Sequence, residues 1–366
     1  MNFFIEWNLW VLIYLAVIGV VFSNNKSRVI ESHESSLVEK YPEFKVSVLF
    51  AILSFLPIII IAANRDEMFA DTSAYIAMYK SWPSSVDLYI KDVDWDSRFP
   101  GFMLFSVFCK QLGLDYRFWL GLIATISGVF LALGYRKYTS DIVTCAFLFF
   151  ASTDYMSWMM NGIRQFLVAA ILFFSFSLIQ KKKYILFIAL VLVLFTIHRS
   201  AILVIPLYFA ALGKPFNKKT LIVLLLCLLA VVFSTQFLDI MDDALQTTSY
   251  NNLVSEFNDD GTNFFRVLVY SIPAILAVIF KKRFDETTPE IINISVNMSL
   301  ISMGLYVISM FTSGIFLGRL PIYFSLFGYI LLIWEINNLF EESMRKIIRI
   351  IMIVLYMVFY CYTWLM

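Results

Sequence analysis

The sequence predicts an all-α protein: a polytopic, membrane-embedded helical bundle that forms a single transmembrane domain over residues 1–366. Three observations support this prediction. Hydrophobic residues make up 60% of the 366 residues, the mean hydropathy is +0.80, and apolar runs alternate with short polar segments. A soluble domain contains about 45–50% apolar residues, so an ordinary soluble fold is excluded. No polar segment is long enough to form a second domain.

Twelve apolar runs are predicted to form transmembrane helices. A straight crossing needs about 20 residues, and several runs are shorter, which indicates a thin bilayer or helices that break at polar residues. The runs lie near residues 7–22, 46–63, 117–135, 141–158, 163–179, 184–197, 201–213, 218–234, 264–280, 291–312, 320–334 and 347–365.

The stretch 99–113 is predicted to be a re-entrant or interfacial helix. It is apolar but only about 15 residues long, too short for a crossing, and it contains Lys110 and Gln111. With this assignment, both termini and the loop 64–98 lie outside. If 99–113 crosses the membrane instead, the topology upstream of it reverses.

Basic residues orient the half of the chain that follows residue 135. The loops there form two alternating sets, of which one contains fourteen Lys and Arg residues and the other contains four, all arginine. Because loops rich in Lys and Arg stay in the cytoplasm, the four arginines are predicted to face outward. The first set is Arg136, Lys137, Lys181, Lys182, Lys183, Lys214, Lys218, Lys219, Lys281, Lys282, Arg283, Arg345, Lys346 and Arg349; the second is Arg164, Arg199, Arg266 and Arg319.

Two outer loops, 64–98 and 235–263, are expected to contribute to the active-site face. Asp92, Asp94 and Asp96 in the first loop resemble an acidic metal motif, but no glycine turn or distal glutamate completes a calcium loop. We therefore expect no metal. The sequence also contains neither a P-loop nor paired Rossmann glycines, so we expect no cofactor and no ATP-driven chemistry within this chain.

The outward arginines indicate recognition of an anion, because the planar guanidinium suits phosphate and carboxylate. Arg164 opens an apolar run together with Asn161 and Gln165. A fixed positive charge there would stabilise a leaving diphosphate. Convergence of Arg164, Arg266 and Arg319 on one anion site is the sharper hypothesis. The alternative for each outward arginine is an anchor in lipid headgroups.

His198 is one candidate for a catalytic base. It follows the apolar run 184–197, which covers about 21 Å at about 1.5 Å per residue, so the imidazole is predicted to lie just inside the outer interface. A histidine there suits proton transfer near neutral pH; alternatively, it only hydrogen-bonds a neighbouring helix. Asp71, which follows Arg65 and precedes Tyr75, is the other candidate base. It could instead position sugar hydroxyls or form a surface ion pair with Arg65.

Four short motifs occur in the order R-D-x4-D-x3-Y, N-x-I-R-Q, H-x-S-A and R-x3-Y-F. They consist of Arg65, Asp66, Asp71 and Tyr75; Asn161, Ile163, Arg164 and Gln165; His198, Ser200 and Ala201; and Arg319, Tyr323 and Phe324. In this order they resemble the EpsG-like branch of the Wzy polysaccharide polymerases, from about residue 60 to 330. The chain departs from some relatives by having Arg98 and Phe99 where they have an acidic residue, so no catalytic carboxylate is transferred there.

The resemblance implies a multi-pass enzyme of the bacterial inner membrane whose active site faces the periplasm. Such an enzyme moves a growing glycan from undecaprenyl diphosphate to the non-reducing end of another lipid-linked repeat, with inversion and without a metal. The product would be O-antigen, capsule or exopolysaccharide. The expected partners are the lipid-linked donor and acceptor, membrane lipids and a chain-length regulator, but no nucleic acid. The catalytic candidates are His198, Arg164 and Asp71; the substrate-binding or diphosphate-binding candidates are Arg65, Asn161, Gln165, Arg199, Arg266, Arg319, Tyr75 and Tyr323.

Two other functions stay open. An O-antigen ligase-like transferase would use the same donor with a different acceptor. A flippase or transporter of lipid-linked sugars would need polar residues through the bundle to both faces, and ionisable residues are scarce within the apolar runs. A membrane O-acyltransferase is disfavoured because it would draw its acyl donor from the cytoplasmic side.

Overall fold

The computed structural model describes residues 8–15, 46–93, 99–245, 261–312, 314 and 317–365. These residues form helices and turns without any β-strand, which confirms the all-α prediction. The helices are α2 (Val48–Ala63), α3 (Thr72–Ser81), α4 (Val86–Lys91), α5 (Pro100–Gln111), α6 (Tyr116–Tyr138), α7 (Ile142–Ala151), η1 (Tyr155–Asn161), α8 (Ile163–Ser175), α9 (Ser177–Gln180), α10 (Tyr184–Phe195), η2 (Arg199–Leu203), α11 (Val204–Ala211), α12 (Lys218–Val232), α13 (Ser234–Leu245), α15 (Phe264–Ile279), η3 (Lys281–Arg283), α16 (Glu290–Met310), η4 (Leu317–Arg319), α17 (Ile322–Asn338) and α18 (Glu342–Leu365).

The structure does not support the prediction of about twelve transmembrane helices. Among the described residues, four helices are long and apolar enough to cross a membrane, or six if each of two bent helix pairs forms one span. The four are Tyr116–Tyr138, Ile163–Gln180, Glu290–Met310 and Glu342–Thr363. Other apolar runs form helices of 10–17 residues, shorter than the roughly 20 residues of a straight crossing. An apolar run in this sequence is therefore not by itself a span.

Polar residues before the apolar runs explain where several helices begin. A side-chain oxygen at each of these positions accepts a hydrogen bond from a backbone N–H of the first helical turn, which otherwise has no partner. The capping residues are Ser47 for α2, Asp115 for α6, Asp141 for α7, Asn217 for α12 and Asn263 for α15.

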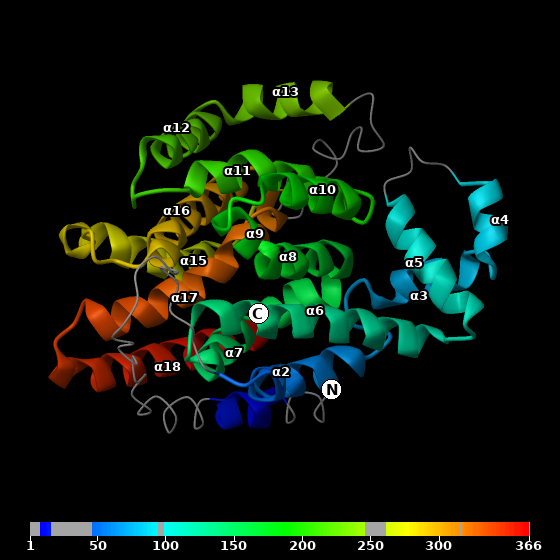
Figure 1. The fold of residues 1–366 in the computed structure, drawn as a ribbon, viewed down its shortest axis with the longest axis horizontal. Helices are drawn as coiled ribbons and strands as arrows, with labels where there is room; N and C mark the ends of the chain where they lie inside the picture. Colours follow the sequence, from blue (N-terminus) through cyan, green and yellow to red (C-terminus); the bar gives the residue numbers. More distant parts are fainter. Residues whose placement is uncertain are drawn as a thin grey trace, which may run out of the picture.

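Aromatic side chains hold the centre of the bundle together. α6 packs against α2 and α8, while α17 packs against α7, α8, α15, α16 and α18 (Figure 1). The ring of Phe173 in α8 lies 4.8 Å from that of Tyr135 in α6 and 5.0 Å from that of Phe327 in α17. Ring contacts of this kind contribute beyond the area that they bury. α8 is thus packed between α6 and α17, and this packing fixes the position of its first turn.

The described part of the segment 64–98, residues 64–93, was predicted to be an outer loop but contains two helices. It forms α3 and α4, which lie with α5 beside the main bundle (Figure 1). The hairpin has its own aromatic core, in which the Tyr79 ring stacks 4.6 Å from Trp119 and Trp82 meets the edge of Phe102. Burial of these rings explains why the segment folds.

α5 is a helix of twelve residues that does not qualify as a span. Its N-terminus docks on the end of α10, where the Gly101 N–H donates to the Thr196 carbonyl at 2.9 Å. A Cβ at Gly101 would lie 2.0 Å from Thr196 Oγ1. This close approach requires glycine, and it brings Phe99 next to the start of α8.

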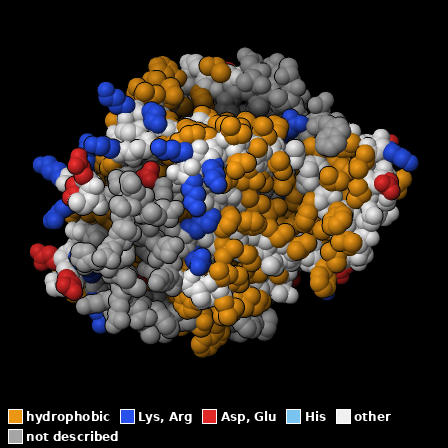
Figure 2. Space-filling view, in the orientation of Figure 1, with side chains coloured by type: hydrophobic (Ala, Val, Ile, Leu, Met, Phe, Trp, Pro, Cys, Tyr) orange, Lys and Arg blue, Asp and Glu red, His pale blue; other side chains and the backbone are white. Residues whose placement is uncertain are grey.

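Basic side chains gather at one end of the bundle. In Figure 2, Lys and Arg side chains cluster toward the left, whereas hydrophobic side chains cover much of the centre and right. In Figure 1 the left is where α12 begins, where α17 ends and where α18 begins. Lys218 and Lys219 in the first turn of α12 and Arg345 and Lys346 near the start of α18 therefore lie at one end of the bundle, as the alternation of basic residues predicts.

Some predicted features lie outside the described residues. They include Asp94 and Asp96, residues 246–260 of the loop 235–263, and all of the first apolar run except 8–15, which is helical. The described beginning of the loop 235–263 belongs to α13.

Candidate active site

A break in the chain places Arg164 and Gln165 in the first turn of α8. The π-helical segment η1 ends at Asn161, and Gly162 separates it from α8. Tyr75 and Asp71 contact Asn161 at this break. The Tyr75 hydroxyl donates to the Asn161 carbonyl at 2.8 Å, and the Asp71 N–H lies 3.4 Å from Asn161 Oδ1. The first two motifs, which are 86 residues apart in sequence, thus meet.

The Arg164 guanidinium stacks on aromatic rings. Its central carbon lies 3.9 Å from the centre of the Phe99 ring and 5.9 Å from those of Tyr75 and Phe102. Its Nη1 atom is buried and has no hydrogen-bond partner among the described residues. Stacking of this kind orients a guanidinium while leaving its N–H groups free to bind. Arg164 therefore carries donors that an anion can use.

Gln165, Ser200 and Tyr323 join three segments around His198. The Gln165 amide donates to the Arg319 carbonyl at 2.8 Å. Ser200 Oγ lies 2.7 Å from His198 Nδ1 and 2.8 Å from the Tyr323 hydroxyl. Residues from the second, third and fourth motifs thus form one hydrogen-bonded group.

His198 lies in the turn between α10 and η2, outside the membrane-spanning helices. Burial, and then the positive charges of Arg164 and Arg319, lower the pKa of His198 to about 3. The imidazole is therefore neutral at physiological pH. The same effect indicates that both guanidinium groups lie close enough to act on the ring, so Arg164, Arg319 and His198 share one site.

Arg65 lies between α2 and α3 and contacts both helices. It is buried, donates through Nε to Thr72 Oγ1 at 3.2 Å and through Nη1 to the Ala62 carbonyl at 3.1 Å. Burial lowers its pKa to about 10, so it stays charged. The third nitrogen, Nη2, has no partner among the described residues. No Arg65–Asp71 ion pair is present in the part of the chain that the structure describes.

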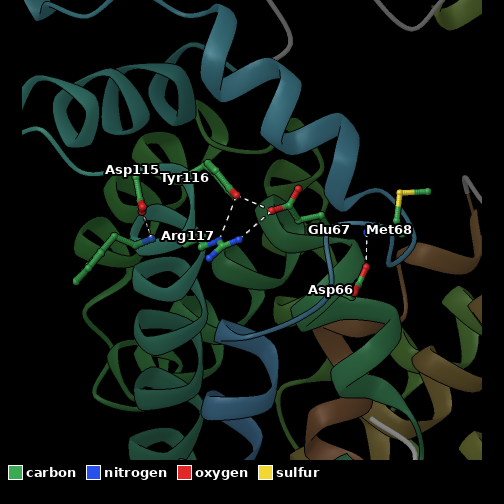
Figure 3. A network of polar contacts seen from close by, with 7 residues as sticks. Asp66, Glu67, Met68, Asp115, Tyr116 and Arg117 are labelled. Atoms are coloured by element: carbon green, nitrogen blue, oxygen red, sulfur yellow. Dashed lines mark hydrogen bonds and ion pairs between the residues drawn. The ribbon is translucent and has the colours of Figure 1, made fainter. Parts of the chain in front are cut away.

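A surface network fixes the loop that carries Arg65. Figure 3 shows the Glu67 carboxylate between Tyr116 and Arg117 at the start of α6. The Tyr116 hydroxyl donates to Glu67 at 2.5 Å, and Arg117 Nη2 lies 3.3 Å from the same oxygen. The hydrogen bond from Tyr116, and then that from Arg117, lower the pKa of Glu67. This network connects the α2–α3 loop to α6.

Arg266 belongs to a different cluster. It donates to Ser157 Oγ through Nη2, and its Nε lies 3.4 Å from the Tyr270 hydroxyl. The Tyr270 hydroxyl in turn donates to the Ser152 carbonyl at 2.8 Å. These contacts direct the guanidinium at the break between α7 and η1. Arg199 lies 5.8 Å from the Phe195 ring, and its role stays a prediction.

Asp154 is a buried polar residue that the sequence reasoning missed. Its side chain is 0% exposed and accepts hydrogen bonds from Trp158 Nε1 at 3.1 Å and from the Tyr329 hydroxyl at 2.6 Å. It follows Thr153, whose φ of +66° belongs to the break where α7 and η1 bend by 85°. The signal was an acidic residue inside a predicted span, which is costly unless it serves a purpose.

The arrangement suits binding of a phosphorylated group. Two guanidinium groups, an amide and a neutral imidazole lie together, and neither Arg164 nor Arg319 forms an ion pair among the described residues. Within the same residues, no three His, Cys, Asp or Glu side chains are grouped to hold a metal. The four cysteines are free.

The family model described as "EpsG family" matches residues 48–366 of the chain. No curated protein and no solved structure matches it.

Proposed function

The chain belongs to the EpsG family, and we propose that it polymerises lipid-linked oligosaccharide repeats into a surface polysaccharide. Family membership indicates a role in polysaccharide biosynthesis and a glycosyltransferase-like activity. In the proposed reaction, donor and acceptor are both carried on undecaprenyl diphosphate, and transfer takes place at the periplasmic face of a bacterial inner membrane. A chain-length regulator is an expected partner.

One observation supports this proposal above the others: Arg164 and Arg319 flank His198 without a carboxylate paired to either arginine in the described structure. Arg164 and Arg319 are half-buried, and two partly desolvated positive charges that act on the same imidazole repel each other, so a bound anion would stabilise both. A lipid diphosphate carries such an anion at the depth of a membrane surface. Bidentate donation by guanidinium fits phosphate oxygens.

In the proposed reaction, an acceptor hydroxyl oxygen attacks the anomeric carbon of the donor glycan. The bond between that carbon and the diphosphate oxygen breaks, and the electron pair leaves with the lipid diphosphate. A single displacement of this kind inverts the anomeric centre. Negative charge grows on the leaving group, so Arg164 and Arg319 stabilise the transition state more than the ground state.

His198 or Asp71 takes the proton of the acceptor hydroxyl. A neutral imidazole can accept a proton, but a pKa of about 3 makes it a weak base before the donor binds. A bound diphosphate offsets the charges of Arg164 and Arg319 and therefore raises the pKa of His198. Base strength then increases only when the donor is in place. Asp71, which is exposed near Asn161, is the alternative base.

A flippase is the second function that the structure bears on. The sequence suggested that ionisable groups within the bundle are scarce, yet Asp154, Glu335 and Arg349 are all buried. The scarcity of interior charge therefore no longer argues against a flippase. The polymerase remains the better proposal because the unpaired arginines gather at one site rather than along a path.

The glycan ladder on cells that carry Arg164→Ala or His198→Ala tests the proposal. Loss of one donor to a developing anion lowers a rate by about 10²–10³-fold, so we expect Arg164→Ala to collapse a multi-rung ladder to a single repeat on the lipid core. We expect the same loss for His198→Ala if it is the base. Arg164→Lys keeps the charge without the fork and should restore the ladder only in part.

Arg283→Ala is the matched control, since Arg283 is exposed in η3 and should leave the ladder unchanged. Each variant's membrane expression is measured alongside. If the protein were a ligase, an inactive variant would leave no repeat on the lipid core. If it were a flippase, an inactive variant would leave the repeat inside the cell. A full ladder from both Arg164→Ala and His198→Ala would contradict the proposed site.

A further inference from the structure

Glu335 is an interior carboxyl group that the proposed reaction does not use. It lies in α17 with 0% of its side chain exposed, and neither carboxylate oxygen has a hydrogen-bond partner among the described residues. Arg349 of α18 binds Asn337, two residues further along α17, but is already paired with Asp141. An unpaired carboxylate is very costly in an apolar interior, so the stable form of Glu335 there is the neutral acid.

Three serines of α16 offer unused hydroxyl groups to the same interior. Ser295, Ser299 and Ser302 are all buried, and none of their hydroxyls has a partner in the described residues. Their spacing of four and three residues places them on one face of the helix. Serine hydroxyls commonly satisfy themselves on the helix backbone, so three unused ones in a row point to a shared ligand.

The polar face of α16 meets the face of α17 that carries Glu335. A Cβ at Gly328 would lie 3.4 Å from Ser299 Oγ, which places these two residues opposite each other. Glu335 follows Gly328 by seven residues, or two helical turns of about 10 Å in total, and so lies on the same face. Ser295 lies one turn from Ser299.

A small cavity occupies the contact between these faces. It is lined by Ser299, Ser302 and Ser325, by Gly328 and Pro273, and by the rings of Tyr270, Tyr329 and Tyr356. The Tyr329 hydroxyl donates to the Asp154 carboxylate at 2.6 Å. One wall of the cavity therefore touches a second buried carboxyl group. The cavity has a volume of about 10 Å³, which is room for about one water molecule. Its wall is mostly apolar, and the polar groups on it without a partner in the described residues are the hydroxyls of Ser299, Ser302 and Ser325.

We propose that this cavity binds water and, with Glu335, forms a proton-exchange site inside the bundle. One oxygen of the Glu335 carboxyl group accepts a proton from a water or serine hydroxyl as its other oxygen releases its own proton to the same hydrogen-bonded chain. Glu335 is therefore a neutral acid before and after the exchange. No oxidation or reduction takes place. The proposal is independent of glycosyl transfer, because it concerns groups of α16 and α17 that lie apart from Arg164 and His198.

The titratable and charged groups that face this site are few. They are Arg266 and Tyr270 from α15, Tyr306 from α16, Tyr329 from α17, Arg349 and Tyr356 from α18, and Asp141 and Asp154 from the α7 side. Arg266 is bonded to Ser157 and Tyr270, and Arg349 is bonded to Asp141 and Asn337. Neither cation is therefore available to hold Glu335 as a carboxylate.

Labelling with dicyclohexylcarbodiimide tests whether Glu335 is protonated, because this apolar reagent forms a stable adduct with protonated carboxyl groups in apolar surroundings. The purified full-length protein in detergent is treated and its peptides are analysed by mass spectrometry. We expect the adduct on Glu335, its loss in Glu335→Gln, and none on the exposed Glu342. Site mapping on the unaltered protein decides this step even if the variant does not fold. Absence of the adduct on Glu335 would overturn the proposal.

Infrared spectroscopy in D2O tests the exchange of the Glu335 proton with water. We expect a protonated-carboxyl band that is missing in Glu335→Gln and that shifts within the mixing time in the unaltered protein. Ser299→Val fills the cavity and removes a hydroxyl, so the shift should slow to hours. Ser54→Val, a buried serine of α2, is the matched control and should exchange as the unaltered protein does. Equal exchange in Ser299→Val and Ser54→Val would show that the cavity is not the route.

Discussion

Arg164 and Arg266 illustrate how surroundings decide what an arginine can do. Both were predicted from the sequence as outward arginines. Arg266 has committed its donors to Ser157 and Tyr270, whereas Arg164 is oriented by the Phe99 ring and retains a buried nitrogen without a partner in the described structure. At the residue scale, Arg164 is therefore the better ligand for an anion, and Arg266 acts on the fold.

The pKa of His198 should rise when a diphosphate binds. Burial and two positive neighbours lower the pKa to about 3, and an anion beside the arginines opposes the second cause. Nuclear magnetic resonance of labelled histidine, in a His33→Gln background so that one signal remains, measures this value with and without undecaprenyl diphosphate. Arg164→Ala should raise the pKa in the ligand-free protein. A ligand-free pKa near the ordinary 6.5 would contradict the site's geometry.

The same shift has a consequence for stability. The pKa of His198 in the folded protein lies below its value in the unfolded chain, about 6.5, so the unfolded chain binds the proton more tightly. The folded state therefore keeps its full free energy of unfolding above pH 6.5. That free energy decreases as the pH falls from there toward 3, because the unfolded chain takes up the proton first. Ligand-free protein should unfold more readily on mild acidification, and bound diphosphate should reduce that loss.

The site residues could be predicted in part. Motif order and loop charge pointed to Arg164, Gln165, His198 and Arg319, and these lie together. Asp154 and Glu335 were missed, because an acidic residue inside or beside a long apolar run barely changes the run's average hydropathy. What gives them meaning is their burial and their partners, and those depend on tertiary contacts.

At the scale of elements, the break between α7 and η1 controls the site. Asp154 ties η1 to α17 through Tyr329, and Arg266 ties it to α15 through Ser157. η1 then leads through Asn161 to the first turn of α8. Two buried polar connections thus hold the segment that positions Arg164. A π-helical segment is often found at a functional site.

Asp154→Asn should weaken this connection. The amide can accept from Trp158 or from Tyr329 but not from both as a carboxylate does, and one buried donor is left without an acceptor at a cost of about 1–3 kcal/mol. We expect a lower unfolding temperature in detergent and a shorter glycan ladder. Asp239→Asn, on an exposed residue of α13, is the control. Unchanged stability and ladder in Asp154→Asn would remove Asp154 from a positioning role.

Elements were predicted less well than residue types. The apolar run 141–158 was taken as one helix, yet it bends by 85° at Thr153 and Asp154. Hydropathy does not report the backbone angle of a threonine. The segment 64–98 was predicted to be a loop because its charged residues lower its mean hydropathy. Hydropathy does not show that Tyr75, Tyr79 and Trp82 are buried.

At the scale of the whole molecule, the bundle has two different ends. Basic residues cluster where α12 and α18 begin and α17 ends, and the candidate site lies at the starts of α8 and η2 and near η4. The sequence allowed the all-α class and this charge asymmetry to be predicted, because both depend on composition along the chain. The number of crossings could not be predicted, because it depends on helix length and bending in three dimensions.

Arg164, Arg319 and His198 are proposed to form one site that transfers a glycan from a lipid diphosphate. The most direct measurement is the length of the polymer that the purified protein makes in liposomes from the single lipid-linked repeat unit of its own host. We expect a multi-repeat ladder from the unaltered protein and from Arg283→Ala, and only the starting unit from Arg164→Ala. A ladder of normal length from Arg164→Ala, or no product from the unaltered protein, would contradict the claim.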